Sequence, residues 1–193
     1  LIVADLDATH AVKVPLVAGG EAIRWKSTKP QIGADQKTAN PVLKTWHPGK
    51  ELIDELAALE DNALECPTCE GYELRVAFQQ PLPPVGGDKT TTPIIPRTFE
   101  DALILQNLEA VKSVEGSQTS KRIRALVDEN LGGEALADEL FELLKTAEKA
   151  AFALDCLMHE DPTAIRPPLY IEKGLAWFEK AIAKDISLSE PVA

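Results

Sequence analysis

The chain has 193 residues and a mass of 20.9 kDa, which suits one domain or one domain that carries an insertion. No apolar run approaches the ~20 residues of a membrane helix, so we expect no contact with a membrane. The net charge of −11 excludes a nucleic-acid binder that works through a basic surface alone. It does not exclude an enzyme that meets a polyanion through bound metal ions. Three cysteines, without a signal peptide, favour a cytoplasmic protein.

The most informative feature lies at the start of the chain. Residues 1–4 are an apolar run that predicts a buried strand, so we expect the chain to begin inside a fold. Asp5-Leu6-Asp7 follows directly, and α/β sheets place ligands at such carboxyl edges. Residues two apart on an extended backbone point to one side, so Asp5 and Asp7 can converge on a divalent cation. The alternative is a strand-end turn whose acids face water.

The next hundred residues alternate between loops and short elements. Residues 19–48 lack periodicity and predict a long loop with a short ribbon near 22–25. A helix is expected over 50–60 and a strand over 72–80. Cys66-Pro-Thr-Cys69 indicates a tight turn rather than half of a zinc site, because no second ligand pair follows at suitable spacing.

The second half predicts helices. A proline-rich loop over 81–96 precedes Thr98, which is expected to cap a helix that continues to about Val111. Further helical patterns cover 121–131, 133–144, 147–158 and 170–184.

Several stretches carry a family resemblance in addition to Asp5-Leu6-Asp7. They are Asn-Pro-Val-Leu-Lys-Thr-Trp-His-Pro-Gly (40–49), Arg-Val-Ala-Phe-Gln (75–79), Arg-Thr-Phe-Glu-Asp-Ala-Leu (97–103), Lys-Ala-Ala-Phe-Ala (149–153) and the segment 170–178. In this order they resemble the Toprim region of the OLD (overcoming lysogenization defect) family of ATP-dependent nucleases. The resemblance implies an α/β fold in which a Toprim-like sheet has flanking helices and an inserted helical segment. It also implies a catalytic core over 1–112 that starts mid-fold, a helical insertion over 113–144, and return helices over 145–193 that complete the core.

The resemblance also implies a two-metal nuclease site. Asp5 and Asp7 match the pair that holds metal, and Glu100 matches an acid that helps to bind a second metal. Lys149 matches the catalytic lysine that stabilises charge on the phosphate. Thr98 stands where a hydroxyl ligand of the metal could lie.

Each of these positions also has a purely structural interpretation. We favour a helix cap for Thr98, and Glu100 could be an ordinary acid of the first helical turn. Asp101 is expected to be a solvated first-turn acid. Lys149 could be an exposed helix lysine, and Lys145, one turn earlier, is its rival.

The function implied is an endonuclease that cuts DNA with Mg²⁺ or Mn²⁺, with Ca²⁺ as a non-productive substitute. ATP would bind only to an upstream ATPase domain, and a homodimer is compatible with the resemblance. A Toprim glutamate is expected upstream, so the chain alone can be inactive. Two alternatives remain: a haloacid dehalogenase-like phosphatase with Asp5 as nucleophile, and a non-catalytic dimerisation or regulatory domain. The phosphatase needs a second acidic motif after a strand, and Gly87-Asp88 lies in the proline-rich loop instead.

Overall fold

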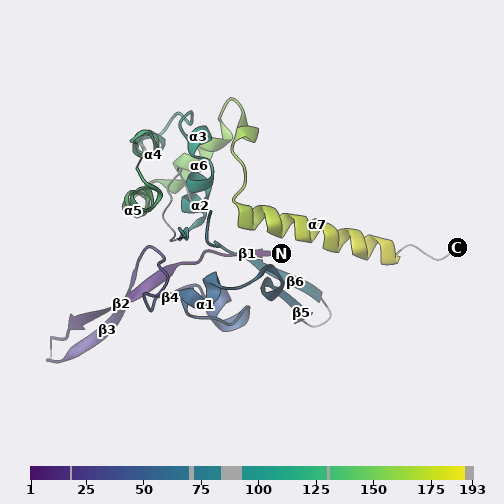
Figure 1. Cartoon of the computed structure of the whole chain (residues 1–193), viewed down its shortest axis with the longest axis horizontal. Helices are drawn as coiled ribbons and strands as arrows, with labels where there is room; N and C mark the ends of the chain where they lie inside the picture. The colour runs from purple at the N-terminus through teal and green to yellow at the C-terminus, as the bar shows by residue number, and fades with distance from the viewer. Residues whose placement is uncertain (18, 70–71, 84–92, 130, 190–193) are drawn as a thin grey trace.

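A computed structural model describes residues 1–17, 19–69, 72–83, 93–129 and 131–189 (Figure 1). Within these residues the fold is mixed α/β, with two three-stranded sheets and a separate group of helices. This confirms the α/β class. The boundaries expected after residues 112 and 144 stay predictions.

The first sheet holds the N-terminal strand in its predicted place. β1 (Ile2–Val3) pairs in parallel with β6 (Tyr72–Ala77), which pairs in turn with the antiparallel β5 (Glu65–Cys69). The tight turn predicted for Cys66-Pro-Thr-Cys69 is therefore wrong, because this segment is a strand whose register shifts between the two cysteines. Fully buried apolar side chains join this sheet to α1 (Ile53–Ala57), among them Leu6, Leu43, Ile53, Leu56, Val76 and Phe78.

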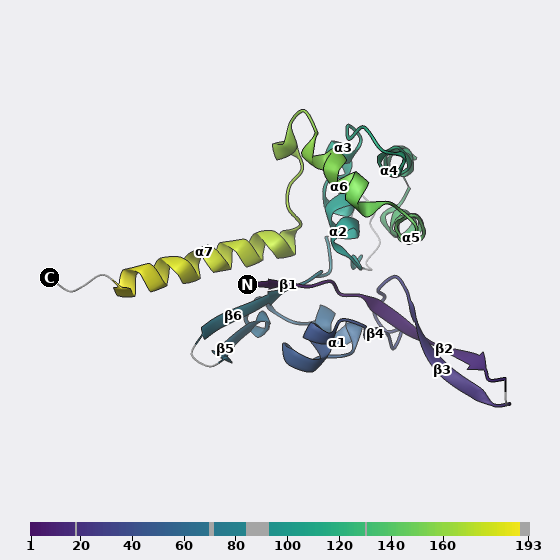
Figure 2. The ribbon, with the colours of Figure 1, turned by 180° about the vertical axis from the view of Figure 1, so that it is seen from behind.

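The second sheet contains a long ribbon, of which only the part near residues 22–25 was predicted. β2 (Ala8–Pro15) and β3 (Glu21–Ser27) pair along their whole lengths, and the short β4 (Lys37–Thr38) joins β2 at its base. Figures 1 and 2 both show the ribbon extending away from the rest of the chain. The rest of β3 escaped prediction because nearly all of its residues face water. β2 was not predicted either, although its residues alternate between half-buried and exposed positions over 10–15.

The helices after residue 98 form a second core. α2 (Phe99–Gln106), α3 (Leu108–Val111), α4 (Gln118–Asp128), α5 (Gly133–Leu144) and α6 (Lys149–Leu157) share one cluster of buried apolar side chains. The single helix predicted as far as Val111 is broken at Asn107, whose amide group pairs with both backbone groups of Arg166. Residues 84–92 of the predicted proline-rich loop lie outside the described residues. Short helical turns cover Val42–Trp46 (π-helix) and Asp61–Leu64 and Pro162–Ala164 (3₁₀).

α7 (Leu169–Ser189) packs its first turns against the first sheet (Figure 1). Gly174 permits a close approach, because a Cβ added there would lie 3.0 Å from Cδ1 of Leu1 and 3.2 Å from Cβ of Ala77. This contact holds Tyr170, near the start of the helix, over the end of β6. No helix in the described part of the chain is long and apolar enough to cross a membrane.

We expect Gly174→Leu to lower the free energy of unfolding by about 2 kcal/mol, because the new side chain would have to push α7 away from the sheet. The gain in helix propensity, about 1 kcal/mol at most, offsets only part of this cost. Urea denaturation measures the effect, with Ala176→Leu on an exposed position of the same helix as the control. Equal stability of the two variants would show that this close approach does not hold the helix.

Candidate functional site

The four residues with predicted catalytic roles come from three separate elements. Asp5 and Asp7 follow β1, Glu100 lies in the first turn of α2, and Lys149 is the first residue of α6. The backbone brings them together because the N–H of Asp7 donates to the carbonyl of Arg97, just before α2. The end of the first strand therefore lies beside the N-terminus of α2.

Asp5 lies half-buried at the centre of this cluster. Its Oδ1 accepts a hydrogen bond of 2.6 Å from Nε2 of Gln79, and the backbone N–H of Phe99 donates to the same carboxylate. Burial raises the pKa of Asp5, and the carboxylates of Asp7 and Glu100 raise it further. The ionised form of Asp5 is thus held in a place that already carries negative charge.

Asp7 has an unusual backbone conformation. Its φ of 48° lies in the left-handed region, so the strand does not continue through the Asp-x-Asp motif as predicted. Non-glycine residues in this region concentrate at functional sites, where surrounding contacts hold them in place. Here Arg97 supplies such a contact, with its guanidinium Nη2 2.9 Å from Oδ1 of Asp7.

Glu100 and Lys149 form an ion pair at the other side of the cluster. Nζ of Lys149 lies 2.8 Å from Oε2 of Glu100, and the hydroxyl of Thr98 donates to the same oxygen over 2.8 Å. Burial by itself would raise the pKa of Glu100, but these two hydrogen bonds outweigh it and leave the pKa below its ordinary value. Lys149 and Glu100, 49 residues apart in sequence, therefore belong to one site.

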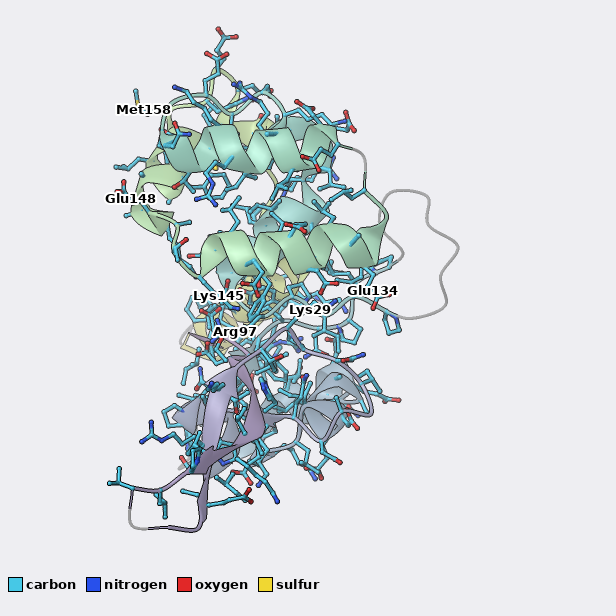
Figure 3. The ribbon with its side chains drawn as sticks, turned by 90° about the vertical axis from the view of Figure 1, so that its left-hand side faces the viewer. Lys29, Arg97, Glu134, Lys145, Glu148 and Met158 are labelled. Carbon is cyan, nitrogen blue, oxygen red and sulfur yellow. The ribbon has the colours of Figure 1, made fainter. Side chains whose placement is uncertain are left out.

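Lys145, the rival of Lys149, is paired with an acid outside the cluster. Its Nζ pairs with Oε1 of Glu142 at 2.6 Å and lies 4.2 Å from the centre of the Phe141 ring. Figure 3 shows Lys145 and Arg97 at the junction between the helices and the strands. Phe152 of α6 is buried, whereas Leu154 and Leu157 of the same helix are exposed.

The two acids in the first turn of α2, Glu100 and Asp101, have different roles, and the role of Asp101 is not the predicted one. Asp101, predicted to be solvated, is 93% buried and forms the capping box with Thr98. Its Oδ2 accepts from the backbone N–H groups of Arg97 and Thr98, at 3.1 and 3.2 Å. Because Asp101 caps the helix, Glu100 is not needed for that role and its carboxylate is directed to the cluster.

Two further residues complete the site, and sequence reasoning gave neither of them a role. The buried amide of Gln79 accepts from the backbone N–H of Leu6 at 2.6 Å and donates to Asp5 and, over 3.2 Å, to the hydroxyl of Tyr170. Burial raises the pKa of Tyr170, as do the nearby charges of Asp5 and Glu100, so the hydroxyl stays neutral. The available signal was a glutamine placed at the end of the apolar run Val76-Ala77-Phe78.

The donor set suits a hard divalent cation of the Mg²⁺ or Mn²⁺ type. Asp5 forms no ion pair with any described lysine or arginine, and two further carboxylates lie near it. Among the described residues, no three His, Cys, Asp or Glu side chains could enclose a metal ion by themselves. Mg²⁺ is commonly held by one or two carboxylates, with water and substrate phosphate supplying the remaining ligands. The cluster fits a site of that open kind, whereas a closed zinc or calcium cage would need more protein ligands.

No family model, curated protein or solved structure matches this chain. The resemblance to the OLD family therefore rests on the motifs themselves.

We expect Gln79→Leu to lower the free energy of unfolding by roughly 2 kcal/mol or more, because it leaves the N–H of Leu6 and the hydroxyl of Tyr170 without partners in a buried place. Gln118→Leu is the control, since Gln118 is exposed at the start of α4. Urea denaturation of both variants measures the difference. A Gln79→Leu protein as stable as the control would contradict the role assigned to this amide.

Proposed function

We propose that the chain is the Toprim-type part of an OLD-like nuclease that hydrolyses DNA phosphodiesters with Mg²⁺ or Mn²⁺. The observation that carries the proposal is the meeting of Asp5, Asp7, Glu100 and Lys149. These residues come from distant motifs that the resemblance links to one catalytic centre, and they lie in one cluster of ion pairs and hydrogen bonds. The proposal includes the family's ATPase domain upstream and the arrangement of core, insertion and return helices over 1–112, 113–144 and 145–193.

Each residue of the cluster has a defined task in this proposal. Asp5 and Glu100, with Asp7 beside them, supply hard oxygen ligands, and a cation bound there stabilises charge on the attacking and leaving oxygens. Gln79 and the N–H of Phe99 hold the Asp5 carboxylate in place.

The cations of the cluster have the complementary task. Lys149 and Arg97 place positive charge beside the carboxylates, where a phosphate group would enter. Thr98 fixes Glu100 through its hydroxyl, so its part is to position the glutamate.

The first test is binding of Mn²⁺, followed by isothermal titration calorimetry. Asp5→Ala and Glu100→Ala should each weaken binding at least tenfold, since each removes one carboxylate ligand from an open site. Because the pKa of Asp5 is raised, protons compete with the cation on acidification from a higher pH than at an ordinary aspartate. The affinity should therefore fall on acidification, and the fall should begin at a higher pH than an ordinary aspartate would cause.

The control for this titration is Asp138→Ala, which removes an exposed carboxylate on α5 that pairs with Lys29 and not with a residue of the cluster. Mn²⁺ affinity that is the same in all variants would overturn the metal site. Covalent modification of Asp5 by the phosphate mimic beryllofluoride would favour the phosphatase instead.

The second test separates the two lysines in the protein with its expected upstream domain. Lys149→Ala should lower the rate of DNA cleavage by ~10²–10³, the usual cost of losing one preorganised donor to a developing negative charge. Lys145→Ala should cleave at the wild-type rate, because this lysine is paired with Glu142. Cleavage of a supercoiled plasmid measures both rates. If only Lys145→Ala lost cleavage activity, Lys145 and not Lys149 would be the catalytic lysine.

A further inference from the structure

The β2–β3 ribbon is a basic element in an acidic protein. Residues 8–27 carry Lys13, Arg24 and Lys26 against a single acid, Glu21, so the ribbon has an excess of two positive charges in a chain of net charge −11. Lys13 pairs with Glu21 near the tip. Among the described residues, neither Arg24 nor Lys26 has an acidic partner, so both charges are available to a ligand.

The two unpaired cations lie on the same face of the ribbon. Arg24 is opposite Val12 and Lys26 is opposite His10 in the antiparallel register, and cross-strand partners share a face. His10 therefore lies next to Lys26 on this face. The opposite face carries Trp25, a residue that is 46% exposed and whose ring centre lies 5.3 Å from Nζ of Lys37.

The ribbon begins at the candidate catalytic cluster. β2 starts at Ala8, directly after Asp7, and the hydroxyl of Thr38 in β4 donates to the carbonyl of Leu6 at 2.6 Å. The far end is free of the two cores, and eight extended residues span about 25 Å. A polyanion that reaches the carboxylates can thus continue along the basic face of the ribbon.

We propose that the β2–β3 ribbon is an arm that holds duplex DNA beside the catalytic cluster, with Arg24 and Lys26 contacting phosphates. The inference rests on the proposed nuclease function and adds the surface that supplies substrate affinity. A two-stranded ribbon is narrow enough to lie in the major groove, and lysine and arginine contacts to phosphates supply sequence-independent affinity. The arm thereby gives an acidic protein a local basic contact with DNA.

The test is binding of a fluorescein-labelled DNA duplex several helical turns long, followed by fluorescence anisotropy with Ca²⁺ in place of Mg²⁺. The double variant Arg24→Ala/Lys26→Ala should bind about tenfold more weakly than the wild type. Its plot of log affinity against log salt should be shallower by about two, since two phosphate contacts are lost. Lys121→Ala/Arg122→Ala is the matched control, because it removes from α4 two exposed cations that have no acidic partner in the described part of the chain. This variant should bind as the wild type does.

The outcomes separate the two proposals. A wild-type chain that does not bind the duplex would overturn the nuclease function and the arm together. Wild-type binding that the ribbon variant retains, or that the α4 control loses equally, would overturn the arm alone. The remaining alternative is that the ribbon joins two copies of the chain, and sedimentation velocity of the variants tests it. A molecular mass that falls only in the ribbon variant would show such an interface and overturn the DNA arm. An unchanged thermal midpoint confirms that the variant is folded.

Discussion

The site depends on one buried amide, that of Gln79. β1 is only two residues long. Beyond it, the backbone N–H of Leu6 donates to the side-chain oxygen of Gln79 instead of to a backbone carbonyl. The same amide donates to Asp5 and to Tyr170, so it joins the first strand, the end of β6 and the start of α7. A neutral amide can hold an anionic carboxylate in a half-buried place without cancelling its charge, which leaves that charge available to a cation.

The charges around this amide are arranged unequally. Asp7 and Glu100 each have a cationic partner, in Arg97 and Lys149, whereas Asp5 has hydrogen bonds from neutral groups only. Burial and its two acidic neighbours therefore raise the pKa of Asp5, while its lysine partner helps to keep that of Glu100 low. Such a separation of environments among adjacent carboxylates is typical of functional sites, because a purely structural cluster gains stability by pairing every charge.

The sequence was informative where local pattern and packing agree. The apolar run before Asp5 and the periodicity of α5 predicted their elements well, because each buries one continuous face. Only residues 22–25 of the ribbon were predicted, since β3 is mostly exposed. The strand over Glu65–Cys69 was missed, since it pairs with an irregular register. At the site, the role of Gln79 depends on contacts with residues distant in sequence. The role of Asp101 depends on which of two adjacent acids caps α2. Neither role follows from the spacing of residues in the sequence.

The acidic composition and the basic ribbon have one physical explanation under the proposed function. A surface of net negative charge repels DNA at long range, so binding must come from a few places where that charge is reversed. The carboxylate cluster can present positive charge to DNA only with a cation bound, whereas the ribbon presents it with its own lysine and arginine side chains. Because Ala8 follows Asp7 directly, both places lie on one continuous stretch of backbone, and the left-handed turn at Asp7 sets the direction in which the ribbon leaves the cluster.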